Sequence, residues 1–486
     1  MGDDEVGGIV AGDGKGFAFL YQEYLSHQED DSMRKLRWLA LVAVFAMVAA
    51  ACGDSGSDTT SAAGGGGGDI AGTEISVFAA PTGDEGQSLQ GTFDVWNEQT
   101  GAQATYEGSD SFEEQLRIRV DGGNPPDVAI TPQPGSICTF ADNGDLVSFE
   151  DMGFDIGDLE SAHGAYFMGL GECADGEHYA IPTNTNMKSI VWYNKPVFEA
   201  NGYTIPTTWD DMVSLSGDVL ADGITPWCIG FGSDAATGWP GTDWIEDILV
   251  RQAGSAFYAD WYNHEVPFDS QEVKDAFATF NEIMFADGFV LGGPSEVPAI
   301  DFRDAPDPMF NDPPSCMFHR QASFIANFFP EGVVSGTDAD FFAFPTIDGN
   351  AGAMGGGELA MVFNDRPEVR QFIADYAGPV YQCVQASTEA PGSDLGGHGV
   401  LTEGNPVERI SANKDTPNDC YQSDTVKKQA AAIATALGAD TFVFDGSDLM
   451  PPDVGQGTFW DGMVDWSRGT SFEDVVATVE ASWPAG

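Results

Sequence analysis

From residue 73 onward, short apolar runs alternate with longer segments in which apolar side chains recur at helical spacing. Between the first two runs, for example, Leu89, Phe93 and Trp96 lie three or four positions apart. This pattern predicts an α/β fold with largely parallel sheets. The first elements are predicted as strands at residues 73–79, 102–107 and 128–130 and as helices at residues 86–100 and 112–120.

Two loops follow the first and third predicted strands, at residues 80–85 and 131–135. Ligands of open α/β sheets bind beyond the carboxyl ends of the strands, so both loops are candidate binding loops. Their side chains with suitable polar chemistry are Asp84, Glu85 and Gln133. In so acidic a chain, a loop carboxylate also fits a simple solvent-exposed position.

The N-terminal region carries the features of a bacterial secretion signal. Residues 33–37 contain three basic side chains, and residues 38–51 form an apolar run that ends in three alanines before Cys52. The run is short for a membrane span and has the flanks of a signal peptide, so residues 33–51 are predicted to be removed. The cysteine resembles that of the lipobox of bacterial lipoproteins. We therefore predict that Cys52 is lipidated and anchors the protein to the outer face of the cell membrane.

Polar segments flank the signal on both sides. Residues 52–72 include five consecutive glycines and few apolar side chains, which predicts a flexible tether. Residues 1–32 are a polar leader. We expect translation to start at Met33 and residues 1–32 to be a wrongly assigned N-terminal extension. The folded body from Thr73 has about four hundred residues, more than one hydrophobic core usually serves, so two lobes are expected.

Charge is the strongest compositional signal. Of the 77 acidic and 19 basic residues, 69 and 15 lie from Cys52 onward, a net charge of about −54. Phosphate binding needs clustered Lys and Arg, which this chain lacks, so nucleic acid is excluded as a partner. Such a charge adds self-repulsion that salt screens, which suggests a saline habitat.

Six cysteines follow Cys52, and an even set in an exported protein predicts three disulfides. Fifteen pairings are possible. We favour the pairs Cys138 with Cys173, Cys228 with Cys316, and Cys383 with Cys420, because the first and third close loops of moderate length. With no Cys-x-x-Cys and no His-rich pair, neither a metal site nor a cofactor is predicted.

Motifs of enzyme active sites are missing from the chain. There is no Gly-x-Ser-x-Gly, no P-loop and no His-Glu-x-x-His, and the six histidines are scattered. These absences predict a protein that is not an enzyme. A glycosidase needs only two carboxylates, so a secreted glycoside hydrolase stays open as an alternative.

Several blocks resemble the family 1 extracellular solute-binding proteins of ABC importers, whose best-known relatives bind maltose. The resemblance covers residues 73–483, and its C-terminal part is most similar to the alpha-glucoside branch. One departure is residues 321–324, Gln-Ala-Ser-Phe, where the family usually has a glycine and an aromatic residue. The blocks that carry it are residues 123–129, 141–147, 179–182, 192–195, 202–211, 316–319, 344–345, 355–357, 444–451, 459–460 and 480–483.

The resemblance implies a two-lobed, type II periplasmic-binding-protein-like (Venus-flytrap) fold that closes over a sugar and delivers it to permease subunits. It implies crossings between the lobes near residues 182–185 and 348–351 and after Tyr376. Lobe I is expected at residues 73–182 and 350–385, and lobe II at residues 183–349 and 386–486. We expect a monomer that touches the membrane only through its lipid.

Sugars need oriented polar groups for their hydroxyls and flat aromatic surfaces for their ring faces. Asn184 and Asn186 lie on a predicted crossing, although Asn there also satisfies turn backbone. Trp239 and Trp244 lie in Gly- and Pro-rich sequence and are the favoured stacking platforms, whereas Trp209 and Trp460 are expected to pack structurally. Backbone can approach a ligand closely at the glycine run, and the candidates there are Gly356, Gly357 and Glu358.

One further alternative keeps the fold and changes the ligand. The abundant carboxylates suit a polyamine, and a metal chelate or a phosphate-bearing solute is also open. A ligand panel that includes cations separates these possibilities from a sugar.

Overall fold

The computed structural model describes residues 70–387, 395, 397 and 407–484. The predicted leader, signal peptide and anchoring Cys52 lie outside the described residues, as does nearly all of the predicted tether. Among the described residues, no helix combines the length and the apolar character needed to cross a membrane.

The larger sheet has seven strands within the described chain. Its order is β10-β4-β9-β3-β1-β2, and β11 also pairs with β9. β1 is parallel to β2 and β3, whereas β9 is antiparallel to β3 and β4. The first three predicted strands are confirmed with small shifts at their ends. The strands are β1 Glu74–Ala79, β2 Gln103–Gly108, β3 Val128–Thr131, β4 Ala180–Met187, β9 Ala353–Val362, β10 Ile410–Ser411 and β11 Phe442–Phe444.

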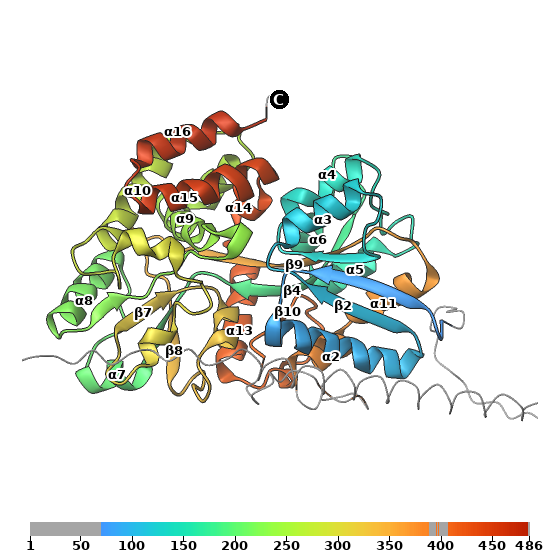
Figure 1. Ribbon diagram of the computed structural model, residues 1–486, viewed down its shortest axis with the longest axis horizontal. Helices are drawn as coiled ribbons and strands as arrows, with labels where there is room; N and C mark the ends of the chain where they lie inside the picture. Colours follow the sequence, from blue (N-terminus) through green and yellow to red (C-terminus); the bar gives the residue numbers. More distant parts are fainter. Residues whose placement is uncertain (1–69, 388–394, 396, 398–406, 485–486) are drawn as a thin grey trace, which may run out of the picture. The chain divides into compact units, whose positions relative to one another are not determined.

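Helices cover both faces of this sheet because alternate strand residues point to opposite sides. In β1, Ile75 and Val77 pack in one cluster with Phe93 of α2, while Phe78 packs against Phe112 of α3 with 5.0 Å between ring centroids. Figure 1 shows α2 and α3 on opposite sides of these strands. The helices are α2 Gly83–Thr100, α3 Phe112–Asp121, α4 Ile137–Asp142, α5 Ile156–His163, α6 Ala165–Gly169, α11 Pro367–Tyr376, α12 Pro379–Ala386 and α13 Asp424–Gly438, and the first two confirm the predicted helices.

The smaller sheet has the order β6-β7-β5-β8. Its central strand β5 is buried throughout, and Val191 and Tyr193 pack with the aromatic core formed by α8, α9 and α10. The C-terminal helices α15 and α16 pack on α9 and α10 (Figure 1). The elements are β5 Ile190–Asn194, β6 Thr225–Trp227, β7 Cys316–Arg320, β8 Ala339–Ala343, α7 Lys195–Asn201, α8 Trp209–Ala221, α9 Trp239–Tyr262, α10 Gln271–Met284, α14 Gly446–Leu449, α15 Trp460–Ser467 and α16 Phe472–Ser482.

Short 3-10 and π turns connect these elements and carry several side chains discussed below. The 3-10 turns are η1 Pro134–Ser136, η2 Asp234–Ala236, η3 Pro294–Ala299, η4 Asp307–Phe310, η5 Ser323–Phe328 and η6 Asn418–Cys420, and the π turn is η7 Asp453–Phe459.

Two segments carry the chain between the sheets, and we call them the crossing segments. The first is the pair Lys188 and Ser189 between β4 and β5, and the second is residues 344–352 between β8 and β9. The backbone N–H groups of Lys188 and Ser189 both donate to the carbonyl of Met354, at 2.9 and 3.1 Å. The first crossing therefore lies a few residues later than expected, because residues 182–185 still pair with β9 inside β4.

The C-terminal part of the chain contributes to both lobes. β10 and β11 belong to the larger sheet, whereas α14 to α16 pack with α9 and α10 beside the smaller sheet. Residues 386–486, which were expected in lobe II as a whole, are thus shared, and the chain passes between the lobes again directly after β11.

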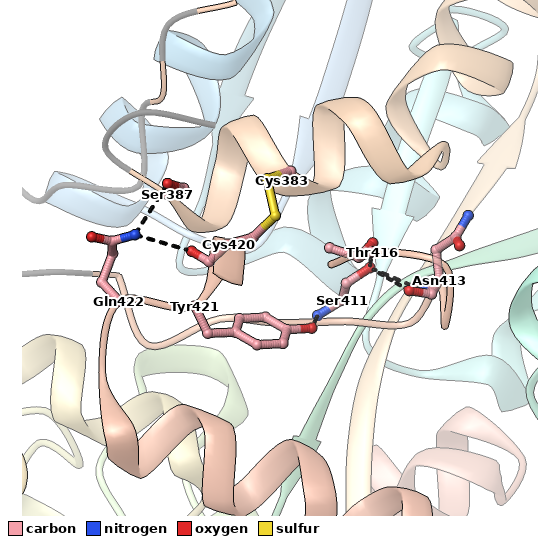
Figure 2. Close-up of a disulfide and its surroundings, with 8 residues drawn as sticks. All are labelled: Cys383, Ser387, Ser411, Asn413, Thr416, Cys420, Tyr421 and Gln422. Atoms are coloured by element: carbon pink, nitrogen blue, oxygen red, sulfur yellow. Dashed lines mark hydrogen bonds between the residues drawn. A yellow bond between two sulfur atoms is a disulfide. The ribbon is translucent and has the colours of Figure 1, made fainter. Parts of the chain in front are cut away.

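The three predicted disulfides are confirmed. Their Cα–Cα distances are 5.5 Å for Cys138–Cys173, 5.7 Å for Cys228–Cys316 and 5.2 Å for Cys383–Cys420. Figure 2 shows how the third bond joins the end of α12 to the segment before α13. Beside it, the Gln422 amide donates to the Ser387 hydroxyl over 3.1 Å, so the covalent link is reinforced by polar contacts.

Candidate functional site

A cavity lies between the two lobes, with walls from both. Its volume is about 190 Å³, far above the roughly 10–15 Å³ that a single water needs, so it has room for a small organic solute. On the side of the larger sheet it is lined by the loops after β1, β2 and β3 and by β4 and β9; on the other side it is lined by α9, by residues 302–303 and by η5.

Eight of the ten predicted ligand-binding residues line this cavity. They come from five separate stretches of chain, which the fold brings together after the carboxyl ends of β1 and β3, along β4 and β9, and at the start of α9. The eight are Glu85, Gln133, Asn184, Asn186, Trp239, Gly356, Gly357 and Glu358.

The other two, Asp84 and Trp244, lie elsewhere. Asp84 is exposed in the first turn of α2. Trp244 is 1% exposed and stacks on Phe280 with 4.6 Å between ring centroids. Five helical positions separate Trp244 from Trp239, which turns the two rings to different sides of α9. Trp239 therefore faces the cavity while Trp244 belongs to the core, and we leave Asp84 and Trp244 out of the proposed site.

The two asparagines on β4 also hold the backbone of β9. The Asn186 side-chain oxygen accepts from the Gly356 N–H at 3.0 Å, and that of Asn184 accepts from the Glu358 N–H at 2.7 Å. A Cβ on Gly357 would lie 2.3 Å from the Asn184 carbonyl oxygen. The glycine run is thus required for the close approach of β4 and β9, in addition to any approach of a ligand.

Aromatic rings form the opposite wall. Trp239 packs against Phe302 at 5.1 Å and against Phe324 at 6.1 Å between centroids. Phe324 lies in the stretch that departs from the family pattern, yet it still supplies a ring to the cavity wall. Trp460, expected to pack structurally, also lines the cavity, and within the described chain its buried indole N–H has no hydrogen-bond acceptor. Trp209 is 5% exposed in the core, as expected.

Each cation that lines the cavity is already paired with a carboxylate. The Lys188 ammonium lies 3.0 Å from Asp243 and also contacts Asp445. Arg303 pairs with Asp110 at 2.5 Å, and the guanidinium of Arg409 contacts Glu358. The lining carboxylates outnumber these three cations; they are Glu85, Asp110, Glu113, Glu358, Glu408, Asp445 and Asp448.

Burial shapes the protonation of these acids. Burial raises the pKa of Glu85 to about 7, although its carboxylate accepts a hydrogen bond from the Asn327 amide at 2.7 Å. Burial likewise raises the pKa of Glu408 to about 7. For Asp445, burial is the largest single influence and acts in the raising direction, but the Lys188 ammonium and the hydrogen bonds to this carboxylate together outweigh it and lower its pKa to about 2. The cavity therefore holds a mixture of proton-bearing and ionised carboxyl groups near neutral pH.

Several lining residues were missed by sequence reasoning, among them Lys188, Arg303 and Arg409. A signal was available: only 15 basic residues lie from Cys52 onward, so each isolated cation in the body needs an explanation. Asp445 and Asp448 were missed as well, although they lie inside a block that carries the family resemblance. Among the described residues, no group of His, Cys, Asp and Glu side chains could hold a metal ion.

Comparison with known proteins gives a match over residues 79–382 to the family described as bacterial extracellular solute-binding protein. The chain belongs to the bacterial extracellular solute-binding protein family. This membership confirms the prediction of a binding protein instead of an enzyme.

Two relatives match this solute-binding protein over most of its length. It is 37% identical to the alpha-glucosides-binding periplasmic protein AglE of Rhizobium meliloti, covering 85% of this chain and 88% of the relative. It is 36% identical to the osmoprotective compounds-binding protein GgtB of Synechocystis, covering 85% and 92%. The family description and the periplasmic relative support an extracytoplasmic location.

Solved structures confirm the predicted two-lobed fold of this solute-binding protein. The bacterial solute receptor AcbH superposes with a TM-score of 0.68 at 17% identity, over 84% of this chain and 97% of the receptor. Maltose-bound MalE3 of T. maritima superposes with a TM-score of 0.62 at 15% identity, over 84% and 98%. At these identities the likeness concerns the fold alone.

Proposed function

We propose that this protein captures a carbohydrate, with an oligosaccharide such as an alpha-glucoside as the favoured ligand, and delivers it to the permease subunits of an ABC importer. The observation that carries the proposal is the cavity wall, which sets carboxylates and amides opposite Trp239 and other rings. Carboxylates accept hydrogen bonds from hydroxyls, and aromatic faces pack on the CH-bearing faces of a sugar ring. The name of AglE, which describes a binder of alpha-glucosides, supports the same class.

Lobe closure is the proposed mechanism. Contacts that join the lobes across the cavity include the Arg303–Asp110 ion pair at 2.5 Å and the Asn327–Glu85 hydrogen bond at 2.7 Å. A solute that touches both walls at once binds the closed form better than the open form, and this difference in affinity drives closure. The closed protein then docks on the permease.

The charges of the cavity favour a neutral solute over a phosphate-bearing one. Lys188, Arg303 and Arg409 each pair with a carboxylate, so the described part of the cavity wall offers no unpaired cation to an anion. An added anion would face the excess of lining carboxylates in a buried site, where repulsion is strong. A polyamine would meet no such repulsion, and a cation panel tests it.

We further propose that Cys52 carries a lipid anchor after removal of residues 33–51 and that residues 52–72 tether the body near its permease. Met33 is then the start of translation. Within the body, residues 73–187 and 353–385 form lobe I and residues 190–343 form lobe II, with residues 188–189 and 344–352 as the crossing segments and the C-terminal part shared. The protein acts as a monomer.

Calorimetry of the full chain carrying Cys52→Ser, which removes the predicted acylation site, tests the ligand class. The panel contains maltose, trehalose, sucrose, glucose, galactose, glucose phosphate, amino acids and spermidine. We expect binding of at least one neutral sugar and none of glucose phosphate. Binding of spermidine alone would show that the ligand is a polyamine and not a sugar. Turnover of a chromogenic glycoside would show that the protein is a glycoside hydrolase.

A further inference from the structure

One buried arginine holds the second crossing segment at both ends. The Arg251 guanidinium, on α9, donates to the carbonyls of Phe344 and Pro345 over 3.2 and 2.9 Å. It also donates to the carbonyl of Gly352 over 3.0 Å. Residues 344–352 join β8 to β9, so a single side chain that is 1% exposed holds both the start and the end of this segment in place.

Asp247, one helical turn earlier, connects this arginine to the first crossing segment. Its carboxylate contacts the Arg251 guanidinium and accepts from the hydroxyl of Ser189. The other carboxylate oxygen lies 3.1 Å from the Arg320 guanidinium at the end of β7. This carboxylate therefore contacts the first crossing segment directly and the second through Arg251, so a change in either segment moves one of its hydrogen-bond partners.

The same network reaches the cavity wall. Arg320 lies 2.9 Å from Asp243, and the second oxygen of Asp243 lies 3.0 Å from the Lys188 ammonium. Lys188 contacts Asp445, and both of these residues line the cavity. We call the row Lys188, Asp243, Arg320, Asp247 and Arg251 the hinge relay. It runs from the ligand cavity to the far end of the second crossing segment.

The members of the hinge relay are between 0 and 5% exposed. A charge in such a place needs its partner, because an uncompensated buried charge is strongly unfavourable. A shift of Lys188 toward or away from Asp243 must then be matched by Arg320 and Asp247. Networks of this kind keep a few satisfied arrangements and avoid the intermediate ones.

We propose that Arg251 and Arg320 are positioning residues for solute capture, which set the closed arrangement of the crossing segments and hold the Lys188–Asp445 pair on the cavity wall. The proposal rests on the proposed function, since it assumes that a solute closes the lobes. Neither arginine lines the cavity, so any effect of either on affinity must pass through the relay.

The test compares Arg251→Lys with the control Arg468→Lys, which changes an exposed arginine after α15. Lysine keeps the charge but cannot reproduce the fork that reaches three carbonyls. We expect Arg251→Lys to weaken binding of the best carbohydrate of the panel by about tenfold or more, measured well below the thermal transition, and the control to leave it unchanged. Arg320→Lys serves as a second variant with the same expectation.

X-ray scattering supplies a readout that loss of stability alone would not change. Without ligand, Arg251→Lys should have a larger radius of gyration than the wild type at the same temperature, since fewer bonds hold the crossing segments. A double-mutant cycle with Lys188→Met should show that the two losses of affinity do not add, because both act on one relay. Additive losses, wild-type affinity in both arginine variants, or unchanged scattering would each overturn the proposal.

Failure of the proposed function has a different outcome. If the wild type binds no carbohydrate, the function is wrong, and the ligand-free scattering of the arginine variants alone decides whether the relay sets the lobe arrangement.

Discussion

The Nζ atom of Lys188 lies 5.1 Å from the centroid of the Trp239 ring. Both residues line the cavity, one from the first crossing segment and one from the start of α9. The same ring meets Phe302 at an angle of 69°. The indole is therefore held from two sides before any ligand arrives, which is the condition for a stacking surface that loses little entropy on binding.

Replacing this ring should weaken solute binding. Trp239→Ala removes the largest flat surface of the cavity wall and should reduce carbohydrate affinity by about 2 kcal/mol, measured by calorimetry. The matched control is Trp483→Ala. Trp483 does not line the cavity and stacks on His264 with 4.2 Å between ring centroids. Equal affinities of the two variants would contradict a stacking role for Trp239.

The buried carboxyl of Glu408 should make stability depend on pH. Burial raises its pKa to about 7 from an ordinary value of 4.5. Between these two pH values the folded protein keeps the proton that the unfolded chain has lost. The free energy of unfolding that this group contributes therefore falls as pH rises, and the full loss is reached above the folded pKa.

Glu408→Gln removes this titration. The free energy of unfolding of the variant minus that of the wild type should therefore increase by up to about 3 kcal/mol from about pH 4.5 to about pH 7.5. Urea unfolding of both proteins at both pH values measures this difference. Glu272→Gln, at an exposed position on α10, is the control and should show no such difference. A Glu408→Gln variant that tracks the wild type at both pH values would show that this carboxyl is not proton-bearing in the fold.

The third disulfide should contribute substantially to stability. Cys383 and Cys420 are 37 residues apart in sequence. Closing a loop of this size lowers the entropy of the unfolded chain and raises the free energy of unfolding by about 2–4 kcal/mol. The double variant Cys383→Ser with Cys420→Ser should lose this amount in urea unfolding. An unchanged midpoint would mean that the polar contacts around Gln422 suffice to hold α12 in place.

Salt should stabilise the fold. With a net charge of about −54 from Cys52 onward, repulsion among surface carboxylates opposes the compact state, and ions screen it. We expect the thermal midpoint to rise between about 0.1 M and about 1 M NaCl. A midpoint that stays constant or falls would remove the basis for inferring a saline habitat.

Much of the fold could be predicted from local pattern. The short apolar run of β1 and the helical spacing of Leu89, Phe93 and Trp96 depend on neighbours in sequence, and these elements formed where they were expected. An even cysteine set in an exported chain predicts disulfides, and the pairs Cys138–Cys173 and Cys383–Cys420 were favoured because each closes a loop of moderate length. Glu85 and Gln133, which lie within a few residues of the ends of β1 and β3, reached the cavity because strand ends meet at one edge of a sheet.

The sequence by itself thus indicated the fold class, the favoured disulfide pairing and part of the polar wall of the cavity. Only the tertiary structure decided which tryptophans face the cavity, since Trp239 and Trp244 differ by their direction around α9 and not by their composition. It also decided that Asp243 on α9 pairs directly with Lys188. Arg320, on a distant strand, then joins Asp243 to Asp247, which contacts Arg251 one turn later on the same helix. Such pairings depend on how segments that are distant in sequence pack together, and the local pattern of residues along the chain does not specify which distant segments come into contact.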